Sequence, residues 1–256
     1  MDLEKITPLV LTYNEEANIG RTLGQLTWAK DVVVVDSYSN DDSIKIAKSF
    51  DNVRVYKRKF DKHANQWNYG LQETDISTKW VLALDADYFV PKELVKEVDD
   101  LEKNSKVSGF EVGFDFCVNG KPLHGTIYPP KVVLFKKNKA NFYQDGHTQR
   151  ISVSGEVAKL SSKIKHDDRK SLERYFKNQL KYTKLESKKI KREYGRSSKF
   201  LLDLKNNKLI SPFLLFLYIL FVKGCILDGW HGVYYGFRRM ITKAMLSIRR
   251  IESENF

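Results

Sequence analysis

The sequence predicts an α/β fold in which a mostly parallel sheet is flanked by helices. Two observations carry this prediction. Strand and helix patterns alternate through the first hundred residues, an order typical of parallel sheets with helical crossovers. In addition, the run "VVVV" at 32–35 is β-branched throughout, as expected of a strand buried on both faces.

The elements of this first part follow one another in a regular order. The expected strands are 6–13, 31–39, 53–58 and 79–87. The expected helices are 14–29, 41–50 and 63–74, and the first of them carries acidic residues in its opening turn. Because ligands bind at the carboxyl ends of the strands in such sheets, the residues that follow each strand are the first candidates for a site.

The pattern changes after about residue 106. Shorter strands are expected at 107–120, 131–137 and 150–155, and they extend the sheet. Residues 168–194 are basic and helical, with a possible buried stripe at four-residue spacing. We therefore expect one domain over 1–167, with halves 1–105 and 106–167, and a basic helical region over 168–256.

Composition limits the partners. Lys and Arg outnumber Asp and Glu by 44 to 32, which gives a formal charge of +12 and favours an anionic partner such as nucleic acid, an acidic membrane or a phosphorylated substrate. Cys117 and Cys225 show no metal-binding or redox spacing, so a reducing compartment is expected. The amino terminus shows no signal-peptide pattern.

The most informative stretch is "LALDADYF", where an apolar strand ends on Asp85 and Asp87. Residues two apart share a face of a strand, and two carboxylates held so close repel unless a cation or hydrogen bonds compensate. One interpretation is a strand end followed by a helix start near Pro91. The other is a divalent-metal site. Polar residues also follow the first two strands, at 12–15 and 36–37, which favours a ligand site.

The C-terminal region begins with a dense apolar run, unbroken from Phe213 to Val222. This is shorter than the roughly 20 residues that a simple membrane span needs. Aromatic residues at 230–237 and a basic segment follow, an order that suits a membrane interface. The alternative is a buried core helix with a solvated basic helix. We expect a monotopic or re-entrant anchor.

Three fragments in this order, "LVLTYNEEANIGRTLGQL", "VVVVDSYSNDDSIKIA" and "KWVLALDAD", resemble family 2 glycosyltransferases, which are inverting enzymes of the GT-A fold. The later segments "GHT", "KHDDRKSL" and "KGCILDGWHG" are similar to the bacterial lipopolysaccharide-core β-glucosyltransferase subgroup. Thr148 departs from that pattern, because the subgroup has Glu there.

The resemblance implies roles for particular residues. Asp85 would hold the ribose or the sugar of a nucleotide-sugar donor, and Asp87 would bind Mg²⁺ or Mn²⁺ on its diphosphate. His166 matches a position that supplies another metal ligand in some relatives, although a structural histidine is an equal alternative. The other donor-binding residues implied by the resemblance are Thr12, Tyr13, Glu15, Asp36, Gln66 and Asn68.

Inversion requires a base that accepts the proton of the acceptor hydroxyl. The candidates are Asp145 and His147 in "YQDGHTQR", with Asp145 preferred. We expect a glycosyltransferase that moves a hexose, glucose first, from a UDP-linked donor to a lipid-linked or lipopolysaccharide-type saccharide. It would act at the cytoplasmic face of a bacterial inner membrane, on an anionic lipid surface.

Rival functions remain. A polyprenyl-phosphate sugar transferase would show fuller membrane spans. A basic nucleic-acid-binding protein would need cations interleaved with exposed aromatics across a groove. The acidic strand ends argue against nucleic acid as a partner. The Thr148 departure leaves room for a non-catalytic scaffold.

Overall fold

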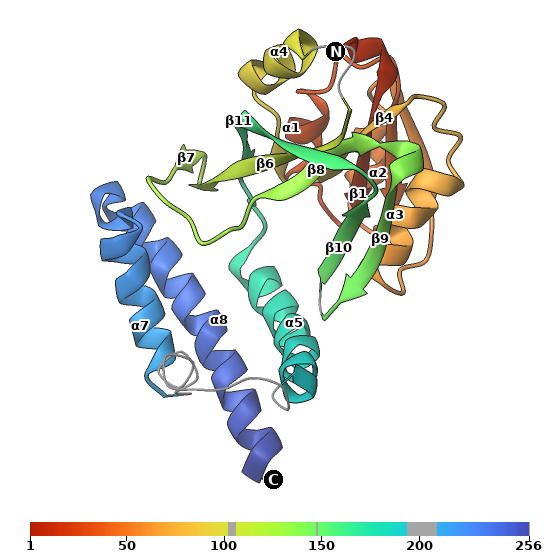
Figure 1. Ribbon diagram of the computed structural model, residues 1–256. Coiled ribbons are helices and arrows are strands. Elements are labelled where there is room, and N and C mark those ends of the chain that lie inside the picture. The colour runs from red at the N-terminus through yellow and green to blue at the C-terminus, as the bar shows by residue number, and fades with distance from the viewer. Residues whose placement is uncertain (102–105, 147, 194–208, 256) are drawn as a thin grey trace. The chain divides into compact units, whose positions relative to one another are not determined.

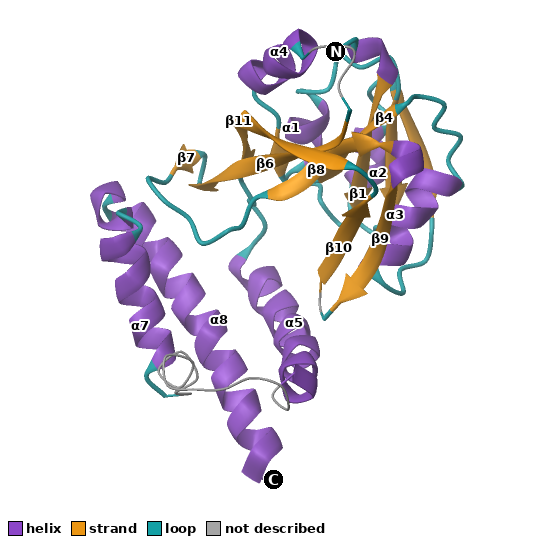
Figure 2. Cartoon of the chain, in the orientation of Figure 1, coloured by secondary structure: helices purple, strands orange, loops and turns teal. Residues whose placement is uncertain are grey.

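A computed structural model (Figure 1) describes residues 1–101, 106–146, 148–193 and 209–255. The chain forms two compact units. The first comprises Met1–Asn119 and Tyr128–Arg169, and the second comprises Gly120–Ile127 and Lys170–Phe256. Figure 2 shows that the first unit holds the main sheet and that the second holds the long helices. The expected division at residue 167 stays a prediction.

The first part of the main sheet is parallel, as expected. Its strands β1 (Ile6–Thr12), β2 (Val32–Asp36), β3 (Val53–Lys57) and β4 (Trp80–Asp85) lie in the order β3-β2-β1-β4. Residues 32–35 are fully buried. The continuous β-branched run therefore reflects burial on both faces.

The second part of the sheet differs from the expectation. Strand β8 (Lys131–Lys136) is antiparallel to both β4 and β6 (Val107–Val118), whereas β11 (Glu156–His166) runs parallel to β6. Strand β5 (Tyr88–Phe89) pairs antiparallel with β11. The sheet is thus mixed, although β1, β2, β3, β4, β6 and β11 all run in one direction and only β8 and β5, among the strands paired here, run against them. Strand β8 is antiparallel because it follows β6 without a crossover helix.

The helices of the first unit are short. They are α1 (Ile19–Leu23), α2 (Ser43–Ala47), α3 (His63–Gln72) and α4 (Lys92–Asp100), with a 3₁₀ turn η1 at Leu3–Lys5 and another, η2, at Lys137–Lys139. The helix expected over 14–29 is reduced to α1. Its close packing explains the glycine at position 20, since a Cβ there would lie 3.2 Å from Ile46 Cγ2.

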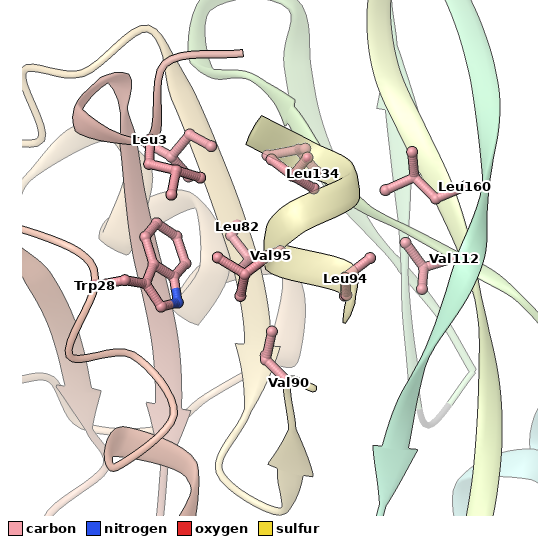
Figure 3. A pocket seen from close by; sticks show the side chains of 11 residues that line it. Leu3, Trp28, Leu82, Val90, Leu94, Val95, Val112, Leu134 and Leu160 are labelled. Carbon is pink, nitrogen blue, oxygen red and sulfur yellow. The ribbon is translucent and has the colours of Figure 1, made fainter. Parts of the chain in front are cut away.

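Two apolar clusters occupy the two faces of the sheet. One joins α1 and α4 to Val10 and Val34, and the other joins α3 to Leu9 and Val33. Figure 3 shows an apolar pocket inside the first cluster, and none of its lining residues carries a charge. This pocket therefore belongs to the core packing.

A separate hairpin, β9 (Ala140–Asp145) and β10 (Thr148–Val153), lies beside α3 (Figure 1). Trp67 of α3 stacks on Phe142 of β9, with ring centroids 5.3 Å apart. A strand was expected at 150–155, where β10 lies, whereas β9 and β11 were not expected from the sequence. The half-exposed pattern of β11 explains this omission, since only Leu160 and Ile164 of that strand are buried.

In its described residues the second unit contains helices and the short strand β7 (Lys121–Pro122). It contains α5 (Leu172–Glu193), α7 (Ser211–Leu217), a π-helical turn η3 (Tyr218–Val222), a 3₁₀ turn η4 (Cys225–Asp228) and α8 (Trp230–Asn255). None of the helices in the described ranges combines the length and the apolar character needed to cross a membrane.

The segment "GCILDGWHG" forms the corner between η3 and α8. Gly224 and Gly229 have φ values of 73° and 62°, a region that favours glycine. At position 232 a Cβ would lie 1.7 Å from the Cys225 carbonyl oxygen, so a side chain is excluded. Buried Asp228 accepts a hydrogen bond from the backbone N–H of His124 at 3.0 Å. The glycines and the aspartate of this motif therefore stabilise a sharp turn.

Candidate active site

The polar residues at the strand ends share one edge of the sheet. Thr12 is in register with Asp36, and Asp85 is in register with Leu11, one residue earlier in β1. Three candidates from separate parts of the sequence are thus neighbours. The parallel register brings them together, as the sequence analysis expected.

Asp36 is fully buried at this edge. Its carboxylate accepts hydrogen bonds from the backbone N–H of Ser39, at 3.0 Å, and from the Ser39 hydroxyl. Gln66, also buried, donates from Nε2 to the Ser37 hydroxyl at 2.8 Å and to the Arg58 carbonyl at 3.1 Å. Gln66 therefore ties α3 to the ends of β2 and β3.

The loop after β1 carries Tyr13 and Glu15. Tyr13 is 52 % exposed beside Asn14, whose φ is 53°. The backbone N–H of Glu15 donates to the Ser43 hydroxyl at 2.6 Å, and its carboxylate accepts from Asn18 Nδ2 at 2.8 Å. A positive φ in a non-glycine residue is strained, and such strain clusters at ligand sites.

Asp87 and His166 meet at the end of β11. Asp87 Oδ2 lies 3.3 Å from His166 Nε2, and both side chains are largely buried, at 13 % and 15 % exposed. The backbone N–H of Asp167 donates to the Asp87 carbonyl at 3.1 Å. Two residues 79 positions apart, both expected to be metal ligands, are therefore in contact.

This pair fits a divalent cation. Buried His166 Nδ1 and Thr12 Oγ1 make no hydrogen bond with any described residue. No cluster of three or more His, Cys, Asp or Glu side chains able to hold a metal occurs in the described ranges. Mg²⁺ and Mn²⁺ commonly take few protein ligands and complete their coordination with phosphate and water. One carboxylate and one imidazole suit that arrangement.

A second layer of charged residues, which the sequence did not predict, supports the Asp87–His166 pair. Arg21 donates from Nη1 to Asp167 Oδ2 at 2.6 Å and from Nη2 to the Asp167 carbonyl at 2.8 Å. Arg169 also pairs with the Asp167 carboxylate, at 3.0 Å. The run "HDDR" after β11 was visible in the sequence, but its partner in α1 was not.

Lys131 is a further residue that the sequence analysis missed. Its Nζ lies 3.8 Å from Asp85 Oδ2 and donates hydrogen bonds to the hydroxyls of Tyr88, at 2.9 Å, and Tyr128, at 2.5 Å. Burial alone lowers the pKa of Lys131, but the negative charge of Asp85 and the contact with Tyr128 outweigh it, so the pKa is raised. Lys131 is therefore a cation at neutral pH.

The two tyrosines connect this cation to the metal-binding candidates. Their hydroxyls are 2.7 Å apart, and their rings lie 5.4 Å and 4.8 Å from the His166 ring, for Tyr88 and Tyr128 respectively. Desolvation by burial raises the pKa of both hydroxyls, so they stay protonated at neutral pH. Lys131, the tyrosines and His166 form one continuous group.

The remaining candidates lie on or beside the β9–β10 hairpin. Asp145 pairs through Oδ2 with Arg150 Nε at 2.5 Å, across the hairpin. Asn68 donates to the Phe142 carbonyl at 2.9 Å and accepts from its N–H at 3.0 Å, so it anchors the hairpin to α3. His147 lies outside the described residues. The choice of base between Asp145 and His147 stays a prediction.

A family-level comparison covers most of the first unit. Residues 9–159, more than half of the chain, match the family described as Glycosyl transferase family 2. An uncharacterised glycosyltransferase of Rickettsia typhi is 33 % identical over 98 residues, which are 38 % of this chain and 32 % of that protein. The chain is thus aligned with about a third of the length of this relative.

Solved structures with the same fold cover nearly the whole chain. A mannosyltransferase from Pyrobaculum calidifontis, in complex with GDP-Man and Mn²⁺, aligns over 98 % of this chain and 88 % of its own, with a TM-score of 0.55 and 14 % identity. TarS 1–349 of S. aureus, in complex with UDP-GlcNAc, aligns over 98 % and 92 %, with a TM-score of 0.51 and 14 % identity. These likenesses confirm the expected GT-A-like fold.

Proposed function

The chain belongs to glycosyl transferase family 2, and from that premise we propose that it transfers a sugar from a nucleotide-sugar donor to a saccharide acceptor. The observation that carries the proposal is the convergence of Thr12, Asp36, Asp85 and the Asp87–His166 pair at one end of the sheet. Carboxylate oxygens and an imidazole at the carboxyl ends of the strands suit the binding of a diphosphate together with a divalent metal ion.

The donor is a UDP-linked hexose, with glucose as the first candidate. Tyr13 directly follows β1 and Tyr38 follows the end of β2 at Asp36, and with 52 % and 58 % exposure both can stack on a nucleotide base. The structural neighbours contain both GDP-Man and UDP-GlcNAc, so the choice of UDP and of glucose rests on the resemblance to the lipopolysaccharide-core enzymes. Asp85 would contact the ribose or the sugar.

The reaction inverts the anomeric carbon. An acceptor oxygen attacks this carbon, the bond to the diphosphate oxygen breaks, and its electron pair leaves on the nucleoside diphosphate. The acceptor proton passes to Asp145 or to His147. A bound Mg²⁺ or Mn²⁺, held by Asp87 and His166, would supply positive charge beside the diphosphate. Arg21 and Asp167 keep the two side chains in place.

The acceptor is a lipid-linked or lipopolysaccharide-type saccharide, reached from the cytoplasmic face of a membrane. The second unit supports this part of the proposal, because large apolar side chains on α7, η3 and η4 are exposed to solvent. They include Phe213, Phe221, Val222 and Leu227, each more than 60 % exposed, and Trp230 at the start of α8 is 61 % exposed. An apolar surface of this kind, with an aromatic residue at its border, suits the acyl boundary of a bilayer.

The cations of α8 contribute less to lipid binding than the sequence indicated. Arg250 is only 7 % exposed, Arg249 donates to Thr183 and Leu180, and the guanidinium of Arg238 lies 3.8 Å from the Tyr175 ring centroid. Burial, with help from the charge of Arg250, lowers the pKa of Lys243. Membrane attachment therefore rests mainly on the apolar side chains.

The experiment that tests the proposal is a thermal-stability screen of the full chain against UDP-glucose, other UDP-hexoses, GDP-mannose and UDP alone, each with and without Mn²⁺. A ligand that binds the native state raises its apparent stability by mass action. We expect stabilisation by UDP-linked compounds that requires Mn²⁺. If no nucleotide or nucleotide sugar stabilises the chain in the presence of Mn²⁺, the proposal is wrong.

A further inference from the structure

Lys131, at the start of β8, approaches Asp85, at the end of the neighbouring strand β4. In the antiparallel β4–β8 ladder, Trp80 pairs with Lys136 and Leu82 with Leu134. The paired residues end there, and β8 shifts its register against β6 between Leu134 and Val132. The contact itself is a distance of 3.8 Å between Lys131 Nζ and Asp85 Oδ2. Opposite charges facing each other across two strands attract.

The ammonium group is held in place on a side chain that is partly exposed. The side chain of Lys131 is 32 % exposed and that of Asp85 is 37 % exposed. Two of the three N–H donors of the ammonium go to the hydroxyls of Tyr88 and Tyr128. The Asp85 carboxylate lies near enough for charge attraction, but 3.8 Å is too long for a hydrogen bond.

The surroundings of this ammonium are aromatic. Its Nζ lies 4.7 Å from the ring centroid of Tyr128, 5.6 Å from that of Tyr88 and 5.9 Å from that of Phe114. Aromatic rings attract a cation, and because they replace water around it they leave its charge less screened toward a neighbouring ligand. The same tyrosine rings border His166, so the cation and the metal-binding pair lie within one group of side chains.

We propose that Lys131 is a donor-binding residue, a fixed positive charge that contacts the diphosphate of the nucleotide sugar in addition to the metal. The site at the strand ends carries Asp36, Asp85 and Asp87, and a diphosphate adds further negative charge. One divalent cation offsets only part of this charge. The ammonium of Lys131 offsets more of it, and keeps its proton while the nucleoside diphosphate leaves.

This inference rests on the proposed function, and the two can fail separately. The test measures the binding of UDP and of GDP by calorimetry, with Mn²⁺ present, for the wild type and for Lys131→Met, Lys131→Arg and Lys136→Met. Lys136 lies at the other end of β8, with its Nζ 5.5 Å from the Trp80 ring centroid, and serves as the matched control.

For whichever of UDP and GDP the wild type binds more tightly, we expect the affinity of Lys131→Met to be about ten- to hundredfold lower than that of the wild type. This is the usual scale for the loss of a hydrogen bond to a charged group. Lys131→Arg should retain most of the affinity, and Lys136→Met all of it. The affinity of Lys131→Met for Mn²⁺ alone should not fall, because the variant lacks a positive charge that would repel the metal ion. A merely structural role would weaken both kinds of binding.

Several results would overturn the inference. They are wild-type affinity in Lys131→Met, an equal loss in Lys136→Met, or a parallel loss of Mn²⁺ binding. Should Lys131→Met fail to fold in a thermal melt, Lys131→Gln replaces it under the same criteria. A wild-type chain that binds neither nucleotide would refute the proposed function and this inference with it.

Discussion

Replacement of Asp87 by Asn separates a binding role from a structural one. Asp87→Asn keeps the shape of the side chain but removes the charge that a metal requires. The hydrogen bond between Asp87 and His166 is long, at 3.3 Å, and an Asn can still make it, so the loss of stability should be about 1 kcal/mol. For a chain of this size that corresponds to roughly 2–4 °C in Tm.

The expected loss of ligand response is larger. A nucleotide at a hundred times its Kd, with Mn²⁺, stabilises the wild type by about 2.7 kcal/mol, or roughly 5–10 °C. Asp87→Asn should show almost none of this increase in a thermal melt. The matched control is Asp115→Asn on β6, which removes a partly exposed ion pair with Lys163 on β11. It should respond like the wild type.

The reasoning is refuted if Asp87→Asn gains as much stability from Mn²⁺ and UDP as the wild type does. It is also refuted if the variant loses several kcal/mol without any ligand, because Asp87 would then be a structural residue.

Three further predictions concern the base, the second layer and the membrane. Asp145→Asn should lower kcat by about 10²–10⁴ with little change in donor affinity; full activity there, with an inactive His147→Ala, would move the role to His147. Arg21→Met should lower the free energy of unfolding, measured in urea, by about 2 kcal/mol. This is less than the loss of a fully buried ion pair costs, because Arg21 is 30 % exposed and Arg169 still pairs with Asp167. An unchanged midpoint of urea unfolding would contradict this prediction. Phe221→Glu should weaken flotation with anionic vesicles at least about tenfold, since burying a phenylalanine contributes about 1.5–3 kcal/mol; wild-type flotation would exclude this face.

The first part of the fold follows from local patterns. The buried run at 32–35 and the apolar strand before Asp85 depend only on side-chain character, and both strands lie where expected. The helix expected over 14–29 was too long, because its two glycines lower helix propensity, and Gly20 lies close against Ile46 of α2. Strand β11 was missed because one side of it is exposed and polar.

The candidate site shows the same division. Asp36 and Asp85 could be placed from the sequence, since the carboxyl ends of parallel strands share one edge. The contact between Asp87 and His166 depends on the β5–β11 pairing, which no local pattern specifies. Lys131 was missed for a similar reason, because its contact with Asp85 depends on β8 lying beside β4 in the sheet.

The most direct test of the central claim is the position of the metal. Crystals of the full chain grown with Mn²⁺ and UDP should give an anomalous manganese peak between the Asp87 carboxylate and the His166 ring, at about 2.0–2.3 Å from each, with the diphosphate as a further ligand. A nucleotide bound elsewhere, or a manganese peak away from these two side chains, would contradict the account.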